Sequence, residues 1–412
     1  MSFDALGLSD ELLKNIAEQG HTTPSPIQLE AIPAALKRRD VMAVSHTGTG
    51  KTAGFTLPVL QLLSEGMKPE AKCIRALVIT PTRELAAQVA TSVLNYSHNL
   101  NIRSAAVYGG ERIERQIDQL EAGVDVLVAT PGRLIDLHNQ HAIKFRQLEV
   151  LVLDEADRML DLGFIDDIRH IQTLLPLKRQ TLMFSATFSK AIKSLAQGML
   201  NDPQLIEVTA VNSAVDTVTQ KIHPVDKELK TAVLIHLIKS NKWQQVLVFS
   251  KTKRGADSLV VELQNAGISA ESIHSNRTQH ARTRALAGFK EGSICVLVAT
   301  DIASRGIDIE QLPCVINVEL PYVPEDYVHR IGRTGRANTS GLAVSLFSEE
   351  EYKQLQAIER LLGRKFEREI VPGFEPSVKG LAHPSEDDEY GNFEADPKPK
   401  GRGKSKKRRR RR

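Results

Sequence analysis

Five short apolar runs in the first half of the chain each end in residues whose types could do chemistry. The runs and the segments that follow them are 41–44 with SHTGTGKT, 76–79 with TPTREL, 124–128 with ATPGR, 150–153 with DEAD and 181–184 with SAT. Runs of β-branched and aliphatic residues, each followed by a turn and a helical pattern, are typical of a parallel α/β sheet. Ligands bind beyond the carboxyl ends of such strands, so we expect all five segments to meet in one cleft.

The segment SHTGTGKT has the composition of a phosphate-binding loop. Gly48 and Gly50 let backbone N–H groups face a phosphate, and Lys51 can reach its β and γ oxygens. Ser45 stands where the motif G-x-x-x-x-G-K-[ST] has its first glycine, which adds only a small side chain. An ordinary glycine-rich turn is the alternative. We expect a nucleotide site made by Ser45, His46, Thr47, Gly48, Thr49, Gly50, Lys51 and Thr52.

Two adjacent carboxylates, Asp154 and Glu155, stand directly after the apolar run 150–153. Asp154, with the hydroxyl of Thr52, could hold Mg²⁺, and Glu155 could orient or deprotonate an attacking water. A solvated acidic turn or the start of a helix is the alternative. Because these acids are expected beside the phosphate loop, they predict hydrolysis of the nucleotide.

The second half of the chain repeats the strand pattern without a phosphate loop of its own. Its apolar runs are 246–249, 294–298, 315–318 and 343–347. The segment HRIGRTGR supplies Arg330, Arg333 and Arg336, and a helix there would place Arg333 and Arg336 on one face. We expect these two to be arginine fingers that complete the γ-phosphate site when the halves close. A structural or RNA-contacting basic patch is the alternative.

Composition limits the class of protein. The 412 residues suffice for two or three domains, and no stretch approaches the roughly 20 apolar residues of a membrane helix. The opening MSFDALGLSDELLKNIAEQG lacks the basic and apolar regions of a signal peptide, and the three cysteines have no C-x-x-C spacing. We therefore expect no membrane contact and a cytoplasmic location.

The periodicity divides the chain into two α/β domains and a tail. We place the first domain at 1–205, a linker at 206–218, the second domain at 219–370 and a disordered tail at 371–412. Residues 398–412 carry eleven Lys or Arg and no acid, which leaves the rest of the chain at −7 against +4 for the whole. We expect this basic run to bind RNA by neutralising phosphates. A solubilising tail or a nuclear signal is the alternative.

Taken together, the motifs resemble those of the DEAD-box ATP-dependent RNA helicases, from residue 3 to about residue 370. The shared segments, in family order, are SHTGTGKT, PTREL (81–85), GG (109–110), TPGR (130–133), DEAD (154–157), SAT (185–187), TDIASRGID (300–308) and HRIGRTGR (329–336). One match of this kind would be weak, whereas eight in order are specific. MSFDALGLSDELL, YVHRIGRTGR and the basic extension look most like the bacterial RhlE-like subgroup.

The resemblance implies two tandem RecA-like domains with ATP and Mg²⁺ between them. It assigns adenine contacts to Phe3, Thr23 and Gln28, whose amide can both donate to and accept from a base edge. A mobile terminus or a core contact is the alternative for Phe3. Gly306 and Asp308 would meet the nucleotide from the second domain. The implied catalytic residues are Lys51, Glu155, Arg333 and Arg336.

The resemblance also implies RNA bound across both domains. Its RNA-contacting positions are Pro81, Thr82, Arg83, Gly110, Thr130, Arg133, Thr252, Gln279, Arg282 and Thr300. Such residues contact phosphates and 2′-OH groups without reading sequence, and with 5% aromatic residues we expect no extended stacking platform. Ser185 and Thr187 would couple hydrolysis to strand separation, a polar strand end being the alternative. His46 stands where Gln is common in the family and Ser275 where Gly is common.

The expected function is an RNA-dependent ATPase that unwinds or remodels short RNA duplexes locally and non-processively. Closure of the two domains by ATP and RNA together would be a population shift, in which each ligand raises the affinity for the other. Ribosomal precursors and RNA-decay machinery are the expected settings. Two alternatives remain at this point: an ATP-dependent RNA clamp or RNP scaffold with little unwinding, and a DNA-directed motor on the same paired domains.

Overall fold

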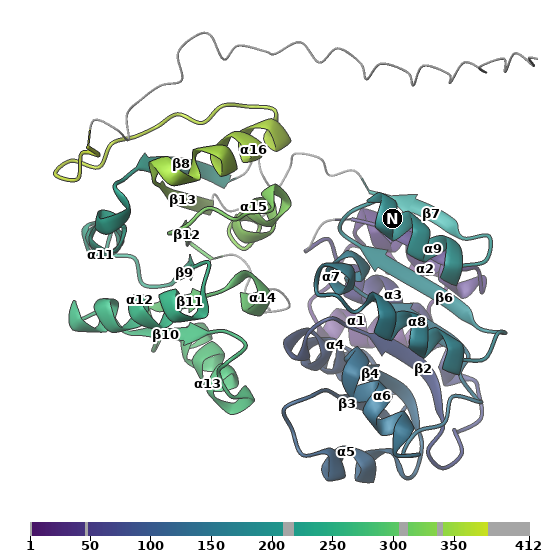
Figure 1. Ribbon diagram of the computed structural model, residues 1–412. Coiled ribbons are helices and arrows are strands. Elements are labelled where there is room, and N and C mark those ends of the chain that lie inside the picture. The colour runs from purple at the N-terminus through teal and green to yellow at the C-terminus, as the bar shows by residue number, and fades with distance from the viewer. Residues whose placement is uncertain (1, 46–47, 209–217, 305–311, 336–340, 378–412) are drawn as a thin grey trace, which may run out of the picture.

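The computed structural model describes residues 2–45, 48–208, 218–304, 312–335 and 341–377, which form two α/β domains (Figure 1). Each domain is built on a sheet, with strand order β3-β4-β2-β5-β6-β1-β7 in the first and β10-β11-β9-β12-β13-β8 in the second. All pairings between neighbouring strands in both sheets are parallel. The predicted class, two parallel-sheet α/β domains, is confirmed.

The elements follow one another as the sequence pattern requires, strand then helix. The strands of the first domain are β1 Val41–Val44, β2 Ile74–Ile79, β3 Ser104–Val107, β4 Val124–Ala129, β5 Val150–Leu153, β6 Gln180–Ser185 and β7 Gln204–Glu207. Its helices are η1 Phe3–Leu6, α1 Asp10–Glu18, α2 Pro26–Leu36, α3 Lys51–Ser64, α4 Arg83–Tyr96, α5 Ile113–Leu120, α6 Pro131–Asn139, α7 Ala156–Asp161, α8 Ile165–Leu174 and α9 Lys190–Met199.

The second domain repeats this arrangement. Its strands are β8 Val218–Pro224, β9 Val246–Phe249, β10 Ala270–Ile273, β11 Val296–Ala299, β12 Cys314–Asn317 and β13 Gly341–Phe347. Its helices are η2 Lys227–Leu229, α11 Lys230–Ser240, α12 Lys253–Asn265, α13 Gln279–Lys290, α14 Asp301–Ser304, α15 Pro324–Ile331, η3 Glu349–Glu351 and α16 Tyr352–Leu362.

The core lies on both faces of each sheet. In β5, Val150 and Val152 pack into the cluster that α2, α3 and α4 cover, whereas Leu151 and Leu153 pack into the cluster under α6, α7, α8 and α9. All four side chains are fully buried, and burying an aliphatic side chain of this size contributes about 1.5–3 kcal/mol. A strand buried on both faces reads as a continuous apolar run, which is why the sequence shows it clearly.

Four strands were not predicted, and all four are edge strands. They are β3 and β7 in the first sheet and β8 and β10 in the second. An edge strand has a neighbour on one side only, so it includes more polar residues; β7 reads QLIE and β8 reads VTQKIHP. The predicted run 294–298 also begins two residues before the strand, which spans Val296–Ala299.

The ends of the domains differ in detail from the predicted boundaries. β7 extends through Glu207 and β8 begins at Val218, while residues 209–217 of the predicted linker lie outside the described residues. Val371 is buried and Phe374 packs against the core of the second domain. Ser377 N donates to Asp226 Oδ2 at 3.0 Å, so the packing of this domain runs past the predicted end at residue 370. The basic run 398–412 lies outside the described residues.

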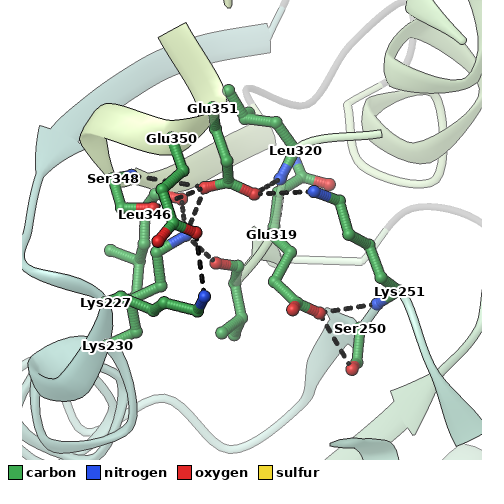
Figure 2. A network of polar contacts seen from close by, with 12 residues as sticks. Lys227, Lys230, Ser250, Lys251, Glu319, Leu320, Leu346, Ser348, Glu350 and Glu351 are labelled. Carbon is green, nitrogen blue, oxygen red and sulfur yellow. Dashed lines mark hydrogen bonds and ion pairs between the residues drawn. The ribbon is translucent and has the colours of Figure 1, made fainter. Parts of the chain in front are cut away.

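A buried charged network joins the strand ends of the second domain (Figure 2). The Glu351 carboxylate forms an ion pair with Lys230 and accepts hydrogen bonds from Lys251 Nζ and Leu320 N, both at 3.1 Å, and from Ser348 N at 3.2 Å. Burial raises the pKa of the Glu351 carboxyl, but Lys230 and Lys251 outweigh it and hold that pKa below its usual value. Because an unpaired buried charge is costly, this carboxylate fixes the segments after β9, β12 and β13 relative to one another.

In the part of the chain that the structure describes, the helices are all too short or too polar to cross a membrane.

Candidate nucleotide and RNA site

One cleft of about 840 Å³ is lined by residues of both domains. It collects twelve of the positions that the sequence singled out, namely Thr23, Gln28, Gly48, Thr49, Gly50, Lys51, Thr52, Asp154, Glu155, Gln279, Arg282 and Arg333. Apart from Thr23 and Gln28, the first-domain members follow strands β1 and β5 at their carboxyl ends. The expectation that separate strand ends meet in one cleft is therefore confirmed for these residues.

The phosphate loop is held by its backbone. Gly50 precedes α3 with a φ of 88°, and a Cβ there would come within 2.4 Å of Gln28 Nε2, so any other residue would be strained and would displace the Gln28 amide. Lys51 is only 7% exposed, and its Nζ donates to Ser45 O at 2.7 Å. This lysine is thus fixed at the loop before any phosphate binds. His46 and Thr47 lie outside the described residues, and Ser45 is buried behind the loop.

Two of the three residues expected to contact adenine, Gln28 and Phe3, differ in their surroundings. Gln28 lines the cleft, with its Oε1 accepting from Ser25 N at 2.9 Å and its Nε2 donating to Gly50 O at 3.0 Å. Its amide therefore ties α2 to the phosphate loop and keeps one N–H free for a base. Phe3 packs into the first domain's core and is 6% exposed, which is the core contact that the sequence left open.

The DEAD turn brings its carboxylates to the cleft from β5. Glu155 adopts a φ of 52°, an uncommon left-handed conformation that starts α7, and its N donates to Asp154 Oδ1 at 3.0 Å. Burial, followed by the charge of Glu155, raises the pKa of Asp154 to about 7, against the opposing effect of Lys51. Asp154 is 3% exposed, and burial disfavours its charged form. A cation bound beside it would stabilise the carboxylate.

The SAT segment contacts the DEAD turn directly. Asp157 Oδ2 accepts from Ala186 N at 3.1 Å, between Ser185 and Thr187. Ser185 Oγ in turn donates to Thr187 O at 2.9 Å. A shift of the SAT segment would therefore move the turn that contains Glu155.

Of the arginines in HRIGRTGR that the structure describes, Arg330 lies in helix α15 and Arg333 lies beyond its end. Helix α15 ends at Ile331, and Gly332 is its C-cap. Arg333 therefore lies in the turn beyond the helix. Arg333 lines the cleft and is 8% exposed. A shared helical face for Arg333 and Arg336 required a helix through Arg333, and α15 ends before it, whereas Arg333 does line the cleft. Arg336, Gly306 and Asp308 lie outside the described residues.

Arg330 instead bonds to residues within the second domain. It is 2% exposed, and its Nε and Nη2 donate to Asp301 at 2.6 and 2.8 Å while its Nη1 donates to Asn317 and to Glu319 O. Its guanidinium also lies 4.9 Å from the centre of the Phe249 ring. With its donors used in this way, Arg330 joins α15 to α14 and to the end of β12.

The predicted RNA-contacting residues of the first domain lie at neighbouring strand ends. Thr82 and Thr130 precede α4 and α6, and Thr82 Oγ1 accepts from Leu85 N at 3.3 Å. Arg83 lies over Gly110, where a Cβ would come within 2.0 Å of its Nη1. Arg133 Nη2 donates to Glu111 O at 3.1 Å, beside that glycine. Three separate motifs, PTREL, GG and TPGR, are thereby joined, while Pro81 is buried next to them.

Two residues at the domain junction were missed by sequence reasoning. Glu84 forms an ion pair across the domains with Arg282 at 2.8 Å and accepts from Gln279 Nε2 at 3.2 Å. The pKa of His329 is lowered by burial, against the charges of Asp157 and Glu155 on the other domain. Both lie inside recognised motifs, PTREL and HRIGRTGR, which was the available signal. Their partners come from the other domain, so no local pattern pairs them.

Comparisons with known proteins agree with this geometry. The DEAD/DEAH box helicase family model matches residues 25–195, and the Helicase conserved C-terminal domain model matches residues 229–338. The DEAD-box ATP-dependent RNA helicase CshA of Geobacillus kaustophilus is 41% identical over 379 residues, 92% of this chain and 80% of CshA. The ATP-dependent RNA helicase RhlB of Pseudomonas syringae pv. tomato is 42% identical over 376 residues, 90% of this chain and 95% of RhlB.

A solved structure supports the same grouping. S. cerevisiae Dbp5 bound to RNA and ADP BeF3 matches with a TM-score of 0.81 and 31% identity, over 90% of this chain and 95% of that chain. The predicted pair of RecA-like domains is confirmed by this likeness, whereas the RhlE-like subgroup stays a prediction. On the two family models, the relatives above 40% identity and this fold, the chain belongs to the family of DEAD-box ATP-dependent RNA helicases.

Proposed function

We propose that this chain is an RNA-dependent ATPase that separates short RNA duplexes locally and non-processively by closing its two domains. The observation that supports this most directly is the composition of the cleft. The first domain contributes Lys51 and Glu155 to it, and the second contributes Arg333. Because a complete set requires both domains, hydrolysis would depend on how the domains are arranged.

Each of these residues has a distinct role in the proposed reaction. Lys51 would exchange its bond to Ser45 O for the β and γ phosphate oxygens of ATP. Glu155 would orient the attacking water and accept its proton, and Arg333 would stabilise the charge that develops on the transferred phosphoryl group. Thr23 and Gln28, which line the same cleft, would contact the adenine. Arg336, Gly306 and Asp308 keep their proposed roles from the family pattern.

Thr52 and Asp154 fit a magnesium ion. A hydroxyl and a single carboxylate suit Mg²⁺, which retains several waters when it binds beside phosphates. The raised pKa of Asp154 supports the fit, since a cation there would favour the charged carboxylate that burial opposes. When bound, the ion would neutralise charge on the β and γ oxygens.

RNA would lie across the strand ends of both domains and draw them together. Arg83, Gly110 and Arg133 form its proposed path on the first domain, and Thr252 and Thr300 follow β9 and β11 on the second. These groups suit phosphates and 2′-OH groups, so we propose structured or duplex RNA of little sequence preference. We further propose a cytoplasmic location, with ribosomal precursors or RNA-decay assemblies as the physiological setting.

Release of a strand from a short duplex tests this function against the clamp alternative. A labelled duplex of about one helical turn is mixed with the protein, ATP and a trap strand, with duplexes several turns long in parallel. We expect ATP-dependent release of the short duplex and little release of the long one. Wild-type ATP hydrolysis with no release of either would favour the RNA clamp, and equal release of a DNA duplex would favour the DNA motor.

Neutralising Glu84 is expected to weaken closure. In Glu84→Gln the shape is kept, but the charged contact to Arg282, whose side chain is 9% exposed, is lost. A hydrogen bond to a charged group contributes about 1.5–3 kcal/mol, so RNA-stimulated ATP hydrolysis at limiting RNA should fall roughly 10- to 150-fold. Hydrolysis without RNA should change little.

The matched control for this variant is Glu114→Gln. Glu114 also lies in the first turn of a first-domain helix, but its side chain is 68% exposed and its nearest cation, Arg112, is 3.9 Å away. Steady-state hydrolysis measured as a function of RNA concentration gives the comparison. Equal RNA dependence in the two variants would show that the Glu84–Arg282 pair contributes nothing to closure.

A further inference from the structure

Tyr322 is an exposed aromatic residue beside the proposed RNA path. Tyr322 is 75% exposed, and no other Phe, Trp or Tyr in the described ranges is exposed. The adjacent Val323 is 50% exposed. An exposed tyrosine ring offers a flat apolar face on which another ring can stack.

One face of the Tyr322 ring contacts the ammonium group of a lysine. Lys251 Nζ lies 4.4 Å from the centre of the Tyr322 ring, within the range of a cation–π contact. The same Nζ donates to Glu351 Oε1 at 3.1 Å, and Lys251 N donates to Glu319 Oε2 at 2.7 Å. Lys251 is therefore fixed at both its side chain and its backbone, as Figure 2 shows.

The chain on the other side of the ring is anchored as well. Leu320 N, two residues before Tyr322, donates to the buried Glu351 carboxylate at 3.1 Å. Tyr322 thus follows an anchored residue and rests on an anchored ammonium. Such a ring keeps its position without a ligand, which lowers the entropy cost of stacking a partner on it.

The sheet order places this ring next to the proposed RNA contacts. Strands β11, β9 and β12 are consecutive neighbours, and they lead into Thr300, Thr252 and the segment that holds Tyr322. Lys251 is itself the residue before Thr252. A strand of RNA that crosses the ends of β11 and β9 in that order would reach the segment after β12 next, and this segment holds Tyr322. Lys253 and Arg254, both exposed in the first turn of α12, add positive charge beside this path.

We propose that Tyr322 stacks on one base of the bound RNA, directly beyond the backbone contact at Thr252, with Lys251 supporting the opposite face of the ring. This inference rests on the proposed RNA-binding function and adds a base contact to a path made otherwise of phosphate and 2′-OH contacts. A stacked base can be any of the four, since each has a π face, so the contact fixes the strand without reading sequence. A single ring is not the extended platform that the sparse aromatics excluded.

The test is RNA affinity of the full-length chain, measured by fluorescence anisotropy with a non-hydrolysable ATP analogue and a single-stranded oligonucleotide. Tyr322→Ala should weaken binding roughly 5- to 150-fold, the range that removal of one stacked base covers. Tyr322→Phe keeps the ring and should bind like the wild type, and Val323→Ala is the matched control for an exposed neighbour. The salt dependence should stay unchanged in Tyr322→Ala, because stacking releases no counterions.

A scan of abasic sites along the oligonucleotide separates stacking from other losses. One abasic position should weaken binding to the wild type and to Tyr322→Phe, and should have no further effect on Tyr322→Ala. Wild-type RNA affinity in Tyr322→Ala would overturn the inference. An abasic site that weakens binding to Tyr322→Ala as much as to the wild type would overturn it as well, and the ring would then be a candidate contact for a protein partner. Failure of the wild type to bind RNA at all would instead contradict the proposed function itself.

Discussion

Replacing Glu155 by Gln is expected to lower kcat for ATP hydrolysis by about 10²- to 10⁴-fold, the contribution typical of a positioned general base. Gln has nearly the same shape, so the turn at φ 52° and the contact of its N–H with Asp154 should survive. ATP and RNA binding should be retained, because Lys51 and the RNA-contacting residues are untouched. The variant should therefore accumulate with both ligands bound.

Single-turnover hydrolysis and the lifetime of the RNA complex measure this effect. The control is Glu121→Gln, since Glu121 has a side chain that is 55% exposed and lies at the end of α5. Slow hydrolysis together with a long-lived RNA complex in ATP is the expected pair of results. Hydrolysis at the wild-type rate in Glu155→Gln would remove Glu155 from its proposed role.

Replacing Arg333 by Ala is expected to lower kcat by about 10³-fold or more, the effect of removing an arginine finger. Arg333 belongs to the second domain, so its loss should leave the first domain's binding of ATP largely intact. RNA affinity without nucleotide should also be unchanged. Steady-state hydrolysis, with ATP-analogue binding measured separately, distinguishes the loss of transition-state stabilisation from a loss of binding.

Arg330 provides the contrast, three residues earlier in the same motif. Its substitution by Ala should reduce the free energy of unfolding by about 3–5 kcal/mol, because it removes a guanidinium that is 2% exposed together with its hydrogen bonds to Asp301, Asn317 and Glu319 O. Arg333→Ala should lose less stability than Arg330→Ala. Thermal unfolding of both variants checks this, and an equal loss of stability would contradict the separate roles assigned to the two arginines.

The parts of the fold that could be predicted are those whose physics is local. β5 is buried on both faces and reads as an unbroken apolar run, so its bounds Val150–Leu153 were predicted correctly. The edge strands β3, β7, β8 and β10 are recognised only from their pairing with a neighbour, because their own residues are partly polar. The turn after α15 was not predicted either. The spacing of the arginines fits a helix, but Gly332 ends the helix before Arg333.

The candidate site shows the same division. Lys51, Asp154 and Glu155 were predictable because each stands directly after a strand in a motif of fixed spacing. The contacts that join the domains were not, because Glu84 meets Arg282 only after both domains have folded. The members of the Lys230–Glu351 ion pair are 121 positions apart in the sequence, so this pair is likewise visible only in three dimensions. The support beneath Tyr322 depends on it.

RNA is expected to draw the two domains together around one ATP site. Steady-state ATP hydrolysis by the full chain tests it most directly, measured without nucleic acid, with structured RNA, and with DNA of matching sequence, with Glu155→Gln as the blank. We expect strong stimulation by RNA, little by DNA, and none in the blank. Equal stimulation by DNA, or the same rate with and without RNA, would contradict it.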